Sequence, residues 1–138
     1  MRSCVVGLLA LLFLTPVAHA QGNLASKPTR LAPLVLNKDL SMSVKEYQIE
    51  TGKYYLWTIE SKGGEEFQLQ APELFRNSWI DQIVINDVEV KPMGGIHSVE
   101  FDEEGKAVIS FIALRPGNYE FFIAGQRERG MLGKFVAR

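Results

Sequence analysis

The sequence has 138 residues, of which 46% are hydrophobic and 22% charged, and its formal net charge is −1 at neutral pH. This length suits one globular domain, and the near-neutral charge gives no general attraction to nucleic acid or to an anionic membrane surface. The sequence contains one cysteine and two histidines, which excludes an internal disulfide and any site built from several thiolates, such as an iron–sulfur cluster.

Residues 1–20 have the pattern of an export signal. Arg2 supplies a positive charge, an apolar run extends from Val5 to Leu14, and Ala18-His19-Ala20 is a small-x-small cleavage site. The apolar run is shorter than the roughly 20 residues that cross a bilayer, so we expect no membrane span after cleavage. The sequence therefore predicts a periplasmic or secreted protein.

Cleavage after Ala20 would remove both Cys4 and His19. The exported part, residues 21–138, would then have His97 as its histidine and no cysteine. A thiolate zinc site, a cysteine nucleophile and covalent haem attachment are excluded for that part, because each of them requires cysteine.

One domain is expected over residues 21–138. Residues 21–33 contain two prolines and show no periodicity, which predicts a loose leader. Short runs with strand character follow, separated by turn signals at a spacing of about ten residues. These runs cover residues 44–49, 54–59, 67–69, 83–85, 88–90, 99–101, 108–114, 119–123 and 134–136.

Residues 71–79 interrupt the strand pattern. Pro72 can begin a turn of helix, while Leu74, Phe75 and Trp79 are large apolar residues at mixed spacing. We expect a short helical or irregular segment over the sandwich. Packing in the core is the default for aromatic residues, and the alternative is that these three are exposed beside Arg76, where a protein partner would bind.

Many short strands with no long helical period predict an all-β protein, a Greek-key β-sandwich of about eight strands with one short helical segment. The sequence shows no internal repeat and no low-complexity segment. Nothing in it indicates a second domain.

A family resemblance lies in residues 115–134. This segment begins with a Pro-Gly turn and continues through two aromatic residues towards a methionine and a closing strand. Its marked positions are Pro116, Gly117, Tyr119, Phe121, Ile123, Gln126 and Met131. The spacing resembles the last hairpin of plastocyanin- and pseudoazurin-like cupredoxins, whose pattern is Tyr-x-Phe-x-Cys, two residues, His, four residues, Met. The resemblance implies a cupredoxin-like fold for the domain.

The copper ligands of that family are replaced here. A type-1 copper site uses two imidazoles and a thiolate, with a weak axial thioether. The resemblance places Ile123 at the cysteine position, Gln126 at the histidine position and Met131 at the methionine position. The family's other histidine, often followed by asparagine, corresponds to Arg76 before Asn77. Because isoleucine has no donor atom, the resemblance implies a degenerate copper site, and we favour no metal and no cofactor.

Two interpretations of this loop remain. In the first, its geometry persists because it closes the sandwich, with Ile123 filling the space of a cysteine–copper unit. In the second, the same end binds a carboxylate, a phosphate or an acidic partner through three arginines and two amides. That candidate anion site comprises Arg76, Asn77, Gln126, Arg127 and Arg129. For residues 127–129 the alternative is a solvated loop that Glu128 partly neutralises.

A copper(I) site is a further candidate. Met93 and His97 lie four residues apart in a glycine-rich loop, and Met131 would add a second thioether. Soft sulfur ligands suit copper(I), although a lone surface histidine explains His97 equally.

Other motifs give little support to metal binding by oxygen ligands or to catalysis. Asp102-Glu103-Glu104-Gly105 lacks the spacing of a calcium loop and predicts a solvated hairpin turn, as do Glu65 and Glu66. Ser98 adjoins His97, but neighbouring residues on a strand point to opposite faces. No hydrolase or phosphate-binding motif is present, and we expect no enzymatic activity.

The resulting hypothesis is an exported cupredoxin-like binding or accessory module without a functional type-1 copper site. It would serve a periplasmic redox or metal system by binding another exported protein or a small anionic ligand. The alternative is a low-affinity periplasmic copper carrier that uses Met131, Met93 and His97.

Overall fold

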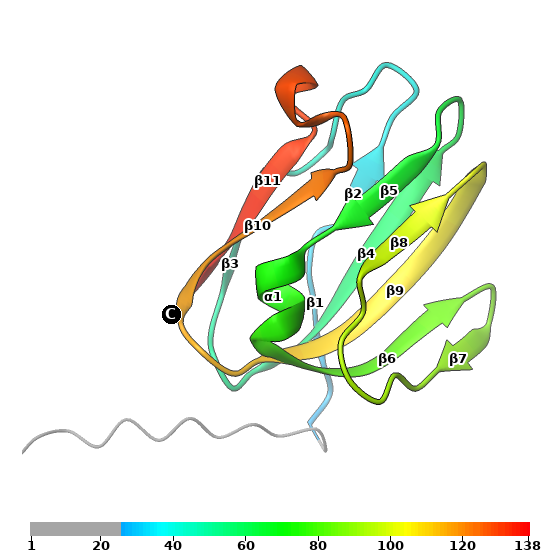
Figure 1. Ribbon diagram of the computed structural model, residues 1–138. Coiled ribbons are helices and arrows are strands. Elements are labelled where there is room, and N and C mark those ends of the chain that lie inside the picture. The colour runs from blue at the N-terminus through cyan, green and yellow to red at the C-terminus, as the bar shows by residue number, and fades with distance from the viewer. Residues whose placement is uncertain (1–25) are drawn as a thin grey trace, which may run out of the picture.

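The computed structural model describes residues 26–138 (Figure 1), so the predicted export signal and residues 21–25 lie outside the described residues. Within this range the chain forms eleven strands, one short α-helix and one turn of 3₁₀ helix. In chain order these are β1 (Thr29–Arg30), β2 (Leu34–Leu36), β3 (Glu46–Ile49), β4 (Tyr54–Lys62), β5 (Phe67–Gln70), α1 (Pro72–Arg76), β6 (Ser78–Ile85), β7 (Val88–Val90), β8 (Ser98–Phe101), β9 (Glu104–Ala113), β10 (Gly117–Ile123), η1 (Arg127–Arg129) and β11 (Leu132–Ala137). None of the helices within residues 26–138 is long and apolar enough to cross a membrane.

The strands form two sheets that pack against each other (Figure 1). One sheet has the order β1-β4-β9-β6-β7, with β2 also paired to β4, and the other has the order β3-β11-β10-β5-β8. Most pairs are antiparallel, but β1 and β2 run parallel to β4, and β3 runs parallel to β11. The predicted all-β sandwich with one short helix is confirmed.

Strands β4 and β9 form a long antiparallel pair, from Tyr54 opposite Ile112 to Lys62 opposite Glu104. Along β4 the side chains alternate between buried and half-buried, as the alternation of apolar residues predicts. Trp57, in the middle of β4, is fully buried. This pair therefore supplies much of the inner face of the first sheet.

Five aromatic rings from both sheets meet at the centre of the core. Trp57 and Phe111 come from the first sheet, while Tyr47, Phe121 and Phe135 come from the second. The ring centroid of Phe135 lies 4.9 Å from those of both Tyr47 and Trp57, and 5.4 Å from that of Phe121. Stacked and edge-on aromatic contacts at these distances add to the hydrophobic stabilisation, so this cluster holds the sheets together.

The corner between β9 and β10, where the chain passes from one sheet to the other, is fastened by Tyr119. Its hydroxyl donates to the carbonyl oxygen of Arg115 at 2.7 Å. A tyrosine that bonds the backbone a few residues upstream is a recurrent way of fixing a sandwich corner. The aromatic position of the cupredoxin-like pattern therefore has a structural role in this chain.

The predicted leader is partly ordered. Thr29–Arg30 pairs with Tyr55 and Leu56 of β4, and the hydroxyl of Tyr47 donates to the carbonyl oxygen of Ala32 at 2.9 Å. The expectation of a loose leader is therefore wrong for the part that the structure describes. Parallel pairing to a distant strand leaves no local periodicity in the sequence, which is why residues 29–30 read as irregular.

The short helix α1 lies where helical structure was predicted, but the suggested exposure of its apolar residues is wrong. Leu74 is 0% exposed and Phe75 3% exposed, because the helix turns these side chains into the core. Trp79, at the start of β6, is 53% exposed, as the alternative interpretation describes. Of the three apolar residues Leu74, Phe75 and Trp79, the exposed one is thus Trp79.

Candidate functional site

The loop that resembles the cupredoxin copper loop joins β10 to β11. Ile123 and Met131 are both 0% exposed and belong to the hydrophobic core. The Ile123 N–H donates to the Met131 carbonyl oxygen at 3.0 Å, and the Met131 N–H donates to the Gln126 carbonyl oxygen at 3.2 Å. These backbone bonds close the loop without any metal ligand.

The outer part of the loop is also held in place. Gly130 follows η1 with a φ of 83°, in the left-handed conformation that favours glycine. Its carbonyl oxygen accepts a hydrogen bond from the Lys45 ammonium group, which comes from the segment before β3. The loop is thus tied to the neighbouring strand.

The side chains present do not fit a type-1 copper ion. The cysteine position holds the aliphatic Ile123, whose side chain is part of the core, and an alkyl group cannot coordinate a metal. Gln126 has a buried Oε1 atom that lacks a hydrogen-bond partner among the described residues, so an amide oxygen and the Met131 thioether are the donors available. The trigonal set of two imidazoles and a thiolate is therefore not offered at these positions, where the Ile123 side chain packs into the core.

The structure does not bring the five candidate anion-binding residues together. Asn77 donates from Nδ2 to the Glu73 carbonyl oxygen at 2.9 Å, and its own carbonyl oxygen accepts the Leu114 N–H at 2.8 Å, before β10 begins. Gln126 follows the end of β10. The length of β10 therefore separates them, and Figure 1 shows η1 at the upper end of this strand, with α1 lower in the molecule.

The three arginines of that candidate site make separate contacts. Arg76 forms an ion pair with Glu73 at 2.6 Å, while Arg127 forms one with Glu120 and lies over the Phe122 ring at 4.1 Å from its centroid. Arg129 is exposed on η1. Glu120, rather than the Glu128 that the solvated-loop interpretation names, is thus the acidic partner of Arg127.

The three copper(I) candidates are also not assembled. Met131 is buried in the core, whereas Met93 is fully exposed in the loop between β7 and β8. His97 is exposed, and its Nδ1 lies 3.3 Å from the Ser98 hydroxyl. A single ion cannot bind a core thioether and a solvent-facing one in this conformation.

Arg76 and His97, which the sequence assigned to separate hypotheses, line the same hollow. It has a volume of about 630 Å³ and lies where the loop between β7 and β8 passes beside α1 and the start of β6. No sequence motif indicated this proximity, because it depends on how the β7–β8 loop folds back. Trp79 also lines this hollow.

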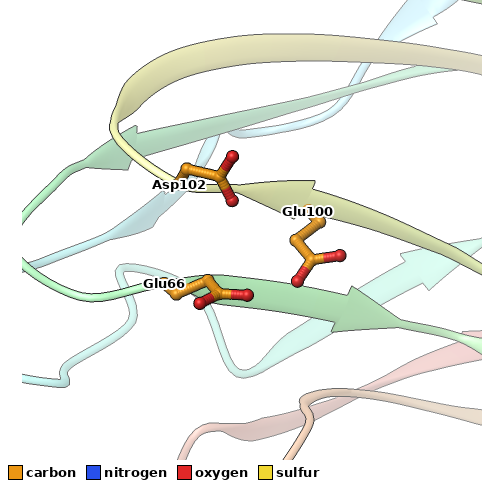
Figure 2. Close-up of side chains that lie close together, drawn as sticks. All are labelled: Glu66, Glu100 and Asp102. Atoms are coloured by element: carbon orange, nitrogen blue, oxygen red, sulfur yellow. The ribbon is translucent and has the colours of Figure 1, made fainter.

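A cluster of carboxylates lies at the end of β8. Figure 2 shows Glu66, just before β5, close to Glu100 and Asp102, and each of the three places an oxygen within 4.8 Å of the others. All three are exposed, in agreement with the solvated turns that the sequence predicts. Asp102 and Glu103 connect β8 to β9 in the opposite sheet, however, so the predicted hairpin is a crossover between sheets.

Crowding in this cluster raises the pKa of Glu100. The main cause is the hydrogen bond with Glu66, and the negative charges of Glu66 and Asp102 add to it. A raised folded-state pKa means that the folded protein holds the proton more tightly than the unfolded chain does. The cluster therefore destabilises the fold at neutral pH, and this cost disappears as the pH falls through the raised pKa.

Replacing Glu100 with glutamine should consequently raise the melting temperature slightly at pH 7. The difference from the unmodified protein should vanish at acidic pH, where the carboxyls are protonated in both states. Thermal unfolding followed by circular dichroism across this pH range measures the effect. Glu103→Gln, an exposed neighbour outside the cluster, is the control. A lower melting temperature for Glu100→Gln at pH 7 would contradict the repulsion.

Comparison with known proteins gives matches in structure only. No family model matches the sequence, and no curated protein sequence matches it. A laccase from Pediococcus acidilactici superposes with a TM-score of 0.67 at 10% identity, covering 94% of this chain and 31% of the laccase. The reduced auracyanin of Roseiflexus castenholzii superposes with a TM-score of 0.52 at 16% identity, covering 82% of this chain and 98% of the auracyanin. A copper-containing nitrite reductase from Thermus scotoductus superposes with a TM-score of 0.60 at 12% identity, covering 83% of this chain and 32% of the reductase.

These similarities confirm the fold that the loop resemblance implied. The chain has a cupredoxin-like β-sandwich fold, and it spans about a third of the length of the laccase and the nitrite reductase but nearly all of the auracyanin. Identities of 8–16% show the architecture and not the chemistry. The laccase and nitrite reductase activities are properties of those proteins.

Proposed function

We propose that this chain is an exported cupredoxin-like module that acts by binding and has no functional type-1 copper centre. The observation that carries the proposal is Ile123. A fully buried aliphatic side chain stands where the pattern has the copper thiolate, and its backbone is bonded to Met131 across a closed loop. The fold is kept while the donor set is lost, which favours a role that does not depend on electron transfer.

The setting of this role is a redox or metal system outside the cytoplasm. The export pattern of residues 1–20 supports that location. The folds shared with a laccase, an auracyanin and a copper-containing nitrite reductase support a connection to such systems. In this proposal the chain is an accessory component that binds another exported protein or a small anion, and it carries out no reaction itself.

Adding Cu(II) to the purified protein tests the proposal directly. The expected result is no intense visible band of a copper–thiolate bond, because no sulfur of the required kind faces a site. The visible spectrum and the bound metal per chain are the two measurements. Such a band, in the chain without Cys4, would overturn the proposal.

A parallel titration with Cu(I) separates the copper carrier from the binding module. The expected result is no stoichiometric binding, since Met131 is buried and Met93 is exposed. Tight binding of one Cu(I) that is lost in both Met93→Ala and His97→Ala would replace the proposal with a carrier. Met42→Leu, a change within the core, serves as the control for general effects of removing a thioether.

A further inference from the structure

A hollow on the side of the sandwich joins two stretches that lie apart in the sequence. One runs from the end of β5 through α1 to the first residues of β6, and the other is the loop between β7 and β8. Its lining includes Phe75, Arg76, Ser78, Trp79, Gly95 and His97. A volume of about 630 Å³ lies within the range of small-molecule sites.

The apolar part of the hollow offers a flat surface. Trp79 is 53% exposed although it is one of the largest apolar side chains, and the buried Phe75 forms part of the wall beneath. An indole left half in water at the rim of a concavity is a surface that aromatic ligands stack on. These residues favour a ligand with a planar apolar body.

The polar part of the hollow favours an anion. Arg76 lines it from α1 and His97 from the loop between β7 and β8, and none of the residues that line it is acidic. His97 contacts Ser98 through Nδ1, which leaves Nε2 without a partner among the described residues. Arginine presents a planar set of donors that matches a carboxylate, so this pair suits one carboxylate group.

The Ser78 hydroxyl gives an independent indication. Its Oγ is buried and has no hydrogen-bond partner within residues 26–138, although Ser78 lines the hollow. Buried hydroxyls nearly always have a partner, and leaving one unpaired costs about 1–3 kcal/mol. Rotation of the Ser78 side chain towards the hollow would let a polar atom of a bound ligand satisfy the hydroxyl, which is otherwise shielded from the hollow.

The loop beside the hollow leaves room for such a ligand. A Cβ on Gly95 would have nothing within 4 Å, and the same is true of Gly94, whose φ of 123° favours glycine. Glycines in a loop allow the backbone to approach a ligand closely. The loop wall is thus open rather than filled by side chains.

We propose that this hollow binds a small organic anion with a planar apolar body, such as an aromatic carboxylate. The ring stacks on Trp79, and the carboxylate lies between Arg76 and His97 within reach of Ser78. The inference deepens the proposed function, since it names the ligand class and the site of a module that acts by binding.

The ion pair between Arg76 and Glu73 sets the strength of this site. Glu73 accepts a hydrogen bond from Nη1 of the guanidinium at 2.6 Å. A guanidinium has five N–H donors, so a ligand can bind beside Glu73, but the two carboxylates then compete for the one positive charge of Arg76. Removing the Glu73 carboxylate should therefore strengthen binding of the anion. A purely structural role for Arg76 would give no such gain.

Naphthoate is a suitable probe, with naphthylmethanol as the uncharged analogue and acetate as the anion without a ring. The protein contains two tryptophans, of which Trp57 is buried and Trp79 exposed. Fluorotryptophan labelling therefore gives one fluorine resonance for each environment. Naphthoate should move the Trp79 resonance and leave that of Trp57 in place, while isothermal titration measures its affinity.

Matched variants locate the anion. Arg76→Gln should weaken naphthoate binding about tenfold, the loss of one charge-assisted hydrogen bond, and Glu73→Gln should strengthen it. Arg127→Gln, which removes an ion-paired surface arginine outside the hollow, should leave the affinity unchanged. Naphthylmethanol and acetate should each bind more weakly than naphthoate.

The inference is overturned by an unmoved Trp79 resonance, by equal binding of naphthylmethanol, or by equal effects of Arg76→Gln and Arg127→Gln. None of these results bears on the copper measurements. If naphthoate does not bind, the absence of a type-1 site is still tested by the Cu(II) spectrum. A copper–thiolate band would refute the proposed function whether or not naphthoate binds.

Discussion

Replacing Gly133 with alanine is expected to destabilise the protein by about 3 kcal/mol or more, a severe overpacking effect for one added methyl group. A Cβ at this position would lie 2.3 Å from Phe121 Cζ and 2.7 Å from the Lys45 carbonyl oxygen. The ring cannot swing aside, because Phe121 is packed against Trp57 and Phe135. The carbonyl belongs to the backbone beside β11 and accepts the Lys134 N–H. Chemical denaturation monitored by tryptophan fluorescence measures the loss.

Gly95→Ala is the matched control for this prediction. It adds the same methyl group where nothing lies within 4 Å, so the free energy of unfolding should change little. Similar stability losses for the two variants would show that general loss of glycine flexibility, and not the clash with Phe121, determines the effect. A Gly133→Ala variant with an unchanged free energy of unfolding would contradict the close packing of β10 and β11.

Phe135→Ala is expected to lower the free energy of unfolding by about 3–5 kcal/mol. The Phe135 side chain is 0% exposed and has four aromatic neighbours, two from each sheet. Its removal leaves a cavity at the point where the sheets meet, and rings fixed by their own neighbours cannot collapse into it. Urea unfolding curves of the two proteins, compared at equal slope, give the difference.

Phe122→Ala makes the same chemical change on the outer face of β10. Phe122 is half-buried and is covered by the Arg127 guanidinium, so a loss of about 1 kcal/mol is expected. Equal losses for Phe122→Ala and Phe135→Ala would mean that the aromatic cluster is not the main link between the sheets.

Local patterns in the sequence predicted most of the sandwich. Alternation identified β4, whose buried residues Tyr55, Trp57 and Ile59 fall on one face, and the turn at Pro116 and Gly117 correctly preceded β10. The spacing of the cupredoxin-like loop was informative because each gap in it corresponds to a geometric requirement. Ile123 and Met131 must meet across the loop, and the backbone bond between them shows that they do.

Features that depend on distant segments could not be predicted in this way. Leu34 and Leu36 are fully buried because β2 pairs with Ile59 and Ser61 of β4, and a three-residue strand carries too little periodicity to reveal this. For Phe75, exposure and burial were both open from sequence. The direction in which α1 turns its side chains depends on the sheet it rests against.

The candidate site shows the same limit. Placing Arg76 near Gln126 relied on aligning Arg76-Asn77 with a histidine-containing loop, but residues 72–76 form a helix beside the start of β10. No local signal predicted that Arg76 and His97 line the same hollow, because the sequence of residues 91–97 indicates only a loop. A site formed by two distant segments can be identified only when the path of the backbone between them is known.

The parallel pairing of β3 with β11 also has a consequence for how the chain folds. The Thr51 N–H donates to the Arg138 carbonyl oxygen, between residues 87 positions apart in the sequence. Strand β3 thus cannot pair until β11 is present, and the central ring cluster stays incomplete without Phe135 of β11. Chains dominated by such distant pairings fold on the scale of milliseconds to seconds. During synthesis, therefore, the core of this domain cannot be completed before Phe135 has been made.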